Sequence, residues 1–290
     1  MLWVWLSLGS AVFYALGALV GKRVLQRAHA LEYAASQSLY ALLLVLVLPF
    51  LPLHLSFGLV GALYFLSFVL AAGNLYYLKS IRHSELSESV PLMNISPLFL
   101  LVLAFVFLGE LPSRLDIVGI FLLIVGAYFV QLTSMRIADF WKPFRVLLTS
   151  RSALYMIFAV LVFSFTAVMQ KALLNWGVSA ISLLVLTRLF VALNYVFLEV
   201  VVHGFQEILR NLHRDGRAIL TSTLASFFSD FFLVLAMAVP GALVSLIIPL
   251  KRTSTFLTAL IGGRLFHEHR LFLKLVGCLI MLAGVLIIAL

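Results

Sequence analysis

Ten long apolar stretches follow one another along this chain, and they constrain its fold more than any other feature. Each comes close to the roughly 20 residues that an α-helix needs to cross the hydrocarbon core of a bilayer. Lipid offers no hydrogen-bond partners to a polypeptide backbone, so we expect each stretch to be helical. Because 64% of the residues are hydrophobic and only 11% are charged, a water-soluble domain is excluded. The sequence predicts an all-α integral membrane protein with ten transmembrane helices.

Charges, prolines and glycines between the apolar stretches set the limits of the expected spans. These spans are Leu2–Gly21, Tyr33–Leu53, Leu59–Leu78, Ser89–Leu108, Leu115–Leu132, Ala153–Leu174, Ile181–Val201, Ala218–Ala238, Leu243–Gly262 and Leu271–Leu290. No small-residue cleavage site follows the first span, so we expect that span to be retained. Little sequence lies outside the spans, and any function is therefore expected within the membrane.

The second half of the chain repeats distinctive residues of the first half. An offset of 158 residues pairs them without a gap: Pro91 with Pro249, Glu110 with Glu268, Gly119 with Gly277, and Gly126 with Gly284. Each half holds five spans, an odd number, so the second copy is expected to enter the membrane in the opposite sense. The predicted parts are a first five-helix repeat at residues 1–134, a connector at 135–152 and a second repeat at 153–290.

A lysine and several glycines recur at fixed places in these repeats. Lys22 closes the first span, Leu108-Gly109-Glu110 ends the fourth, and Val118-Gly119 with Gly126 lies in the fifth. This order resembles the EamA family of the drug/metabolite transporter superfamily. The second half departs from the pattern at His267-Glu268-His269. The resemblance implies alternating access around a central cavity lined by both halves, and it implies no particular substrate.

The net charge of +9 is distributed over short loops beside the spans, which argues against nucleic-acid binding. Loops after odd-numbered spans carry most of the lysines and arginines. The positive-inside rule therefore predicts that both termini lie outside. The membrane is expected to be a bacterial or archaeal cell membrane. No phosphate loop, metal-ligand cluster or nucleophile motif stands out, so we expect no enzyme and no cofactor. The expected partners are a small-molecule solute and membrane lipid, and the protein is expected to be a monomer or homodimer.

Two adjacent cations, Lys251 and Arg252, lie inside the ninth span, where an uncompensated charge is costly. Lys251, Ser254, Thr255 and Thr258 follow the i, i+3, i+4, i+7 spacing of one helix face. One interpretation is that the two cations bind an anionic group. The pair also resembles the phosphate-binding Lys-Arg of triose-phosphate and nucleotide-sugar transporters. The other interpretation is that both side chains snorkel to the headgroups or pair with Asp230.

Asp230 is the one carboxylate deep in any predicted span, and it shares a helix face with Ser222, Ser226 and Ser229. It is interpreted either as a proton-coupling group or as a counter-ion for Arg188, Lys251 or Arg252. An unpaired buried carboxylate is the costlier arrangement, which favours the counter-ion. Arg188 itself is either a cavity residue or a brace between helices, and the brace is somewhat favoured.

The first half offers hydrogen-bonding and aromatic groups instead of cations. We expect Asn74, Tyr77, Tyr40 and Asn94 to contribute to substrate binding. Glu88 begins the fourth span, where a carboxylate complements the helix dipole, and a gating or proton-relay role is the alternative. Glu110 and Glu268 are expected to pair with loop cations.

These features together predict a secondary active transporter of small organic metabolites, with a preference for an anionic or phosphorylated solute. A first alternative is a proton-coupled exporter of cationic or zwitterionic solutes such as amino acids or drugs, with Asp230 or Glu88 as the coupling carboxylate. A second alternative, from another class, is a non-transporting membrane scaffold or lipid-headgroup binder.

Overall fold

The computed structural model describes residues 1–43, 55–83, 93, 96–131, 151–254, 257–258 and 271–289. The helices in this part of the chain are α1 (Leu2–Leu25), α2 (Ala30–Ala41), α3 (Phe57–His83), α5 (Ser96–Leu108), α6 (Arg114–Gln131), α9 (Arg151–Asn175), α10 (Ala180–Val202), α11 (Phe205–Ala238), α12 (Val244–Lys251) and α14 (Leu271–Ala289). The described residues contain no strand, so the predicted all-α class is confirmed for them. Every predicted span overlaps one of these helices.

Five helices of the described residues are long and apolar enough to cross a membrane. They are Leu2–Leu25, Phe57–Arg82, Arg151–Asn175, Ala180–Val202 and Phe205–Ala238. Two shorter apolar helices, Ser96–Leu108 and Leu279–Ile288, accompany them. Large apolar side chains such as Trp5, Phe68 and Phe197 lie exposed on these helices. Lipid is the environment in which such an apolar exterior is stable.

Several helices begin at residues that satisfy their first backbone amides. At the start of α6, the Ser113 amide donates to Asp116 Oδ2 at 2.8 Å, and the Asp116 amide donates to Ser113 Oγ at 3.1 Å. Ser179 accepts a hydrogen bond from the Ser182 amide, 3.1 Å away, at the start of α10. These reciprocal capping contacts fix where the helices begin.

Helix α11 starts earlier than the predicted span Ala218–Ala238, at Phe205. Asp215 interrupts its helical backbone with φ −129° and ψ 19°. Residues 205–214 therefore form a separate helical segment, which a kink divides from the rest of α11. Ile208 and Asn211 of this segment are buried. An apolar face allows such a short polar segment to pack as a helix outside the hydrophobic spans.

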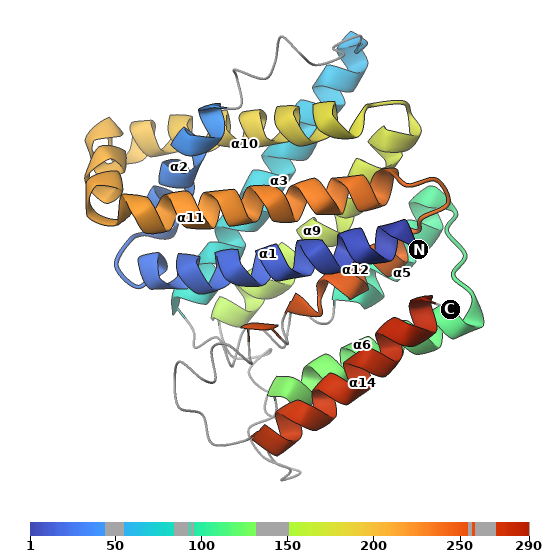
Figure 1. Ribbon diagram of the computed structural model, residues 1–290. Helices are drawn as coiled ribbons and strands as arrows, with labels where there is room; N and C mark the ends of the chain where they lie inside the picture. Colours follow the sequence, from blue (N-terminus) through green and yellow to red (C-terminus); the bar gives the residue numbers. More distant parts are fainter. Residues whose placement is uncertain are drawn as a thin grey trace.

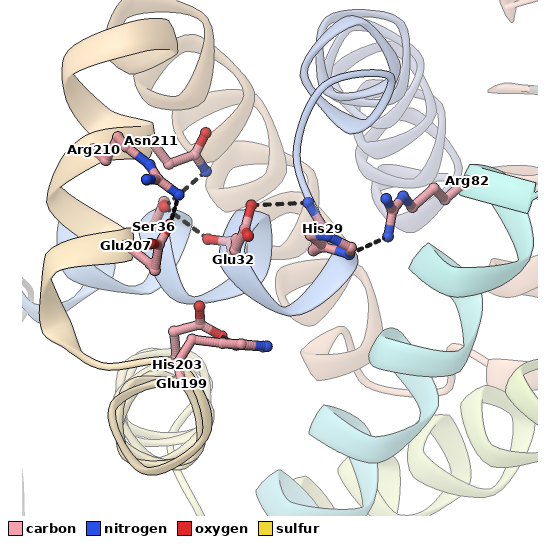
Figure 2. Close-up of polar contacts among 9 residues, drawn as sticks. All are labelled: His29, Glu32, Ser36, Arg82, Glu199, His203, Glu207, Arg210 and Asn211. Carbon is pink, nitrogen blue, oxygen red and sulfur yellow. Dashed lines mark hydrogen bonds and ion pairs between the residues drawn. The ribbon is translucent and has the colours of Figure 1, made fainter.

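Polar contacts join α2 to α11 and to α3 at this end of the bundle (Figure 2). Asn211 donates to Ser36 Oγ at 3.0 Å, and the His29 amide donates to Glu32 Oε2 at 2.9 Å. The Arg82 guanidinium of α3 reaches His29 Nδ1. The contacts of Asn211 with Ser36 and of Arg82 with His29 join segments that are far apart in the sequence.

The helices pair across the two halves of the chain. Helix α1 packs along α11, α3 along α9, α2 along α10, and α6 along α14. The antiparallel pair of α6 and α14 stands at one side of the bundle, and both termini lie at the same end (Figure 1). Each pairing joins a helix within residues 1–131 to a helix within residues 151–289.

Glycines allow α6 and α14 to approach closely. A Cβ atom at Gly126 would lie 2.6 Å from the Gly277 carbonyl oxygen, and one at Gly284 would lie 2.8 Å from the Gly119 carbonyl oxygen. Side-chain-free positions are required wherever two backbones meet at such distances. The four glycines paired by the 158-residue offset therefore form one helix-helix interface.

The predicted continuous helix over Leu243–Gly262 is wrong at its centre, because α12 ends at Lys251. Pro249 has no amide hydrogen, so the regular i to i−4 ladder is broken there. The Arg252 amide is shared between the carbonyls of Ile248 and Pro249, at 3.1 and 3.0 Å, and the Thr253 amide donates to Leu250 at 3.1 Å. These i−3 bonds tighten the chain into a turn and end the helix.

Candidate functional site

A cavity of about 250 Å³ lies among α1, α2, α3, α9, α10, α11 and α12. Both halves of the chain contribute to its wall. Apolar side chains such as Leu70, Leu78 and Phe163 cover part of the surface. The polar lining includes four cations, one carboxylate and several hydroxyl and amide groups. A mostly preformed pocket with a few convergent polar groups is the usual form of a small-molecule site.

Asp230 of α11 lies between two cations of neighbouring helices. Its Oδ2 atom is 2.5 Å from one terminal nitrogen of Arg188, and its Oδ1 atom is 3.8 Å from Lys251 Nζ. The same Arg188 nitrogen donates to the Ser226 carbonyl at 2.8 Å. One carboxylate thus neutralises two cations only in part, so the net charge of these three side chains is positive.

Lys251 and Arg252 point into the cavity from the end of α12. Lys251 Nζ lies 5.0 Å from the centre of the Tyr14 ring, within the range of a cation–π contact. Arg252 Nε donates to Ser96 Oγ at 2.9 Å. Both adjacent cations line the cavity wall at the point where α12 ends.

Tyrosines and amides form the other part of the polar wall. Tyr14 donates to the Tyr77 hydroxyl at 2.9 Å and so links α1 to α3. Tyr33 donates to Ser222 Oγ at 3.0 Å, and the Gln37 amide contacts both groups at 3.0 and 3.1 Å. The hydrogen bonds hold these side chains in fixed orientations around the cavity.

Six predicted site residues line the cavity: Asn74, Tyr77, Arg188, Asp230, Lys251 and Arg252. Tyr40 is not among the lining residues, and its hydroxyl lies 3.4 Å from the Gly216 carbonyl oxygen. Ser254 is also absent from the lining and is buried in the protein. The predicted residues Thr255, Asn94 and Glu88 lie outside the described part of the chain, as does Glu268.

Several cavity residues were missed by sequence reasoning, namely Tyr14, Lys22, Tyr33 and Gln170. A signal for the first two was present in the sequence. Tyr14, Gly17, Ala18, Gly21 and Lys22 follow the spacing of one face of the first span. That face holds small and polar residues where lipid contact would favour larger apolar ones. Gln170 gave no comparable pattern.

Glu110 supports α12, the helix that carries the two cations, from the loop between α5 and α6. Its carboxylate accepts hydrogen bonds from the Val244 amide at 2.8 Å and the Ser245 amide at 3.0 Å. The hydrogen bonds of Glu110 are therefore to the start of a helix, and Lys171 is a cation close enough to interact with it electrostatically. A carboxylate at a helix N-terminus satisfies free amides and interacts favourably with the helix dipole. Nearby, Lys171 Nζ donates to the Met237 carbonyl at 2.7 Å, at the end of α11.

The charge of the cavity determines which chemistry it supports. Four cations line the wall, Lys22, Arg188, Lys251 and Arg252, and Asp230 is the single carboxylate among the lining residues of the described chain. Within that same part of the chain, no three His, Cys, Asp or Glu side chains converge as metal ligands. The arrangement is suited to binding an anion, because guanidinium and ammonium groups form short, strong hydrogen bonds with carboxylates and phosphates.

Comparisons with known proteins show which family the first part of the chain resembles. The profile of the EamA-like transporter family matches residues 1–132. Among solved structures, one crystal structure has a TM-score of 0.72 and 11% identity, and the match covers 98% of this chain and 95% of that one. At that identity the likeness shows the fold alone. No curated protein matches the sequence. The apolar helices indicate a multi-pass integral membrane protein, and its residues 1–132 are similar to the EamA-like transporter family.

Proposed function

We propose that the protein is a secondary active transporter of small organic anions, including phosphorylated metabolites. The observation that carries this proposal is the excess of cations in the cavity, where Arg188, Lys251 and Arg252 face a single carboxylate. The desolvation of these cations inside a membrane is costly unless a ligand supplies negative charge. The aromatic and amide groups opposite them suit the organic part of such a solute.

The proposed mechanism is alternating access between two inverted five-helix repeats in a ten-span protein. The reciprocal pairing of helices supports this proposal. Helix α1 packs on α11 and α9 packs on α3, so exchanging the two repeats, α1 for α9 and α3 for α11, exchanges these two pairs. The glycine contacts have the same two-fold relation. Gly126 approaches the backbone of Gly277, and the equivalent Gly284 approaches the backbone of Gly119. Rocking of one repeat against the other around a fixed central site is the expected motion.

A ligand-stabilisation assay and a flux assay test the anionic substrate. The purified protein is titrated with glucose 6-phosphate, citrate, arginine and a quaternary ammonium compound, and uptake of each compound is measured in proteoliposomes. Lys251→Ala is expected to weaken the binding of the two anions about tenfold, which corresponds to the loss of one charge-assisted contact. Lys79→Ala is the matched control, because Lys79 contacts the Tyr76 ring and does not line the cavity.

A second candidate is a proton-coupled exporter of cationic or zwitterionic solutes. The observation that favours it is the position of Asp230, whose side chain is 36% exposed and lines the cavity. The two candidates predict opposite results. If Lys251→Ala leaves all anion binding intact while Asp230→Asn abolishes uptake, the anion proposal is refuted. If no compound of either set is transported or bound, a scaffold or headgroup-binding role is favoured.

A further inference from the structure

A second, smaller chamber lies behind the Arg188–Asp230 ion pair. Its volume is about 30 Å³, and its polar lining consists of Gln170, Thr187, Arg188 and Asp230. Leucine and valine side chains form the remainder of the wall. Three of these four polar residues, Gln170, Arg188 and Asp230, also line the main cavity, so the chamber is an annex of that cavity.

Two buried polar atoms of the annex residues have no hydrogen-bond partner within the described chain, Thr187 Oγ1 and Arg188 Nε. Thr187 is 5% exposed, so its hydroxyl has no access to bulk solvent. Threonine hydroxyls inside helices usually donate to a backbone carbonyl one turn earlier, as Thr223 does to Ile219 at 2.8 Å. Thr187 does not, and buried polar groups of this kind are nearly always satisfied by water or a ligand.

The donors and acceptors of the annex restrict what it binds. The Arg188 Nε–H group is a permanent donor and requires an acceptor, which excludes a bare metal cation. The ionised Asp230 carboxylate is an acceptor only, and it would repel chloride. A water molecule both accepts and donates, and the annex is larger than the roughly 10–15 Å³ of accessible space that one water molecule requires.

We propose that the annex holds an ordered water that joins Arg188 Nε to Thr187 and Gln170 and so positions the guanidinium toward the main cavity. Asp230 and the Ser226 carbonyl hold one terminal nitrogen of Arg188 from the other side. Fixing Nε as well restricts rotation of the guanidinium plane. Thr187 is then a positioning residue for the anion-binding Arg188, and this role rests on the function proposed above.

The experiment compares Thr187→Val, which replaces the hydroxyl by a methyl group of similar volume, with Thr187→Ser, which keeps the hydroxyl. Thermal midpoints of the purified full-length protein are measured with and without glucose 6-phosphate. If the water is present, Thr187→Val lowers the thermal midpoint by a few degrees and weakens the binding of glucose 6-phosphate about three- to tenfold. Thr187→Ser stays close to the wild type in binding. Thr223→Val is the matched control, and it is expected to leave the affinity unchanged.

The sign of the midpoint shift decides the proposal. A hydroxyl that is buried without any partner is unfavourable, so its replacement by a methyl group would raise the midpoint or leave it unchanged. That result would overturn the water site. The failure of the anionic function is distinguishable, because glucose 6-phosphate would then fail to stabilise even the wild type, whereas the midpoint shift of the ligand-free variants still reports on the water.

Discussion

Glu110 and Ser245 are 135 residues apart in the sequence and are joined by two hydrogen bonds. One Glu110 carboxylate oxygen, Oε2, lies 2.6 Å from Ser245 Oγ and 3.0 Å from the Ser245 amide nitrogen. Oε1 accepts the Val244 amide at 2.8 Å. A single acidic side chain from the first half therefore anchors the helix that carries Lys251 and Arg252 in the second half.

Replacing Glu110 by alanine is expected to destabilise the protein by about 2–4 kcal/mol, because two amides and a hydroxyl would lose a charged acceptor in a buried place. The loss is measured as a fall in the thermal midpoint in detergent. Glu207→Ala is the control, since Glu207 pairs with the exposed Arg210 and such surface pairs contribute about 0–1 kcal/mol. Equal effects of the two substitutions would contradict the anchoring role.

Gly126→Ala is expected to destabilise the contact between α6 and α14 by about 1–3 kcal/mol. The new Cβ atom would lie 2.6 Å from the Gly277 carbonyl oxygen and 2.7 Å from the Met281 amide nitrogen, and backbone atoms cannot move aside easily. Gly61→Ala is the control, because no atom lies within 4 Å of its added Cβ. The thermal midpoint should fall for Gly126→Ala alone, and a neutral Gly126→Ala would argue against the close packing.

Helix positions were predictable from the sequence because lipid leaves the polar backbone of an apolar segment no alternative to internal hydrogen bonding. Spans such as Arg151–Asn175 and Ala180–Val202 agree with the prediction to within two residues at each end. The helical segment at residues 205–214 was not predicted, because its charges interrupt the hydropathy signal. Ile208 of this segment is buried by contacts with other helices, and a hydropathy profile carries no information about such contacts.

The candidate site was predictable where a charge inside a span demanded a partner. Arg188, Asp230 and Lys251 were singled out on that ground, and the structure brings them together. Tyr40 was selected only because it is an aromatic residue in a span, and it lies outside the cavity lining. The hydrogen bonds of Glu110 to the start of α12 were not predicted, because they go to backbone amides and a hydroxyl and no sequence pattern marks which helix start lies nearby.

The orientation of the chain in the membrane is tested by a reporter fused after Leu290. The excess of lysine and arginine in loops after odd-numbered spans predicts that both termini lie outside. Both termini lie at one end of the structure, in keeping with an even number of spans (Figure 1). We expect alkaline phosphatase at this position to be active and a fluorescent protein to be dark in a bacterial host. Cytoplasmic reporter activity would refute the predicted topology.

Asp230→Asn separates a counter-ion from a coupling group, because it removes the charge and keeps the shape. The substitution leaves Arg188 and Lys251 without their shared carboxylate, so the ligand-free protein should lose about 1–2 kcal/mol of stability. This is less than for a fully buried pair, since 36% of the Asp230 side chain is exposed and its charge is partly screened.

In the proposed anion site, the Asp230 carboxylate competes with the solute for the same two cations. Its removal is therefore expected to tighten the binding of glucose 6-phosphate about three- to tenfold, measured by isothermal titration at low salt. Raising the salt concentration should reduce this gain, because added ions screen the freed cations. Ser229→Ala serves as the control, since Ser229 contacts Ser10 and bears no charge. A weaker affinity for glucose 6-phosphate in Asp230→Asn would instead assign the carboxylate a direct part in holding the solute.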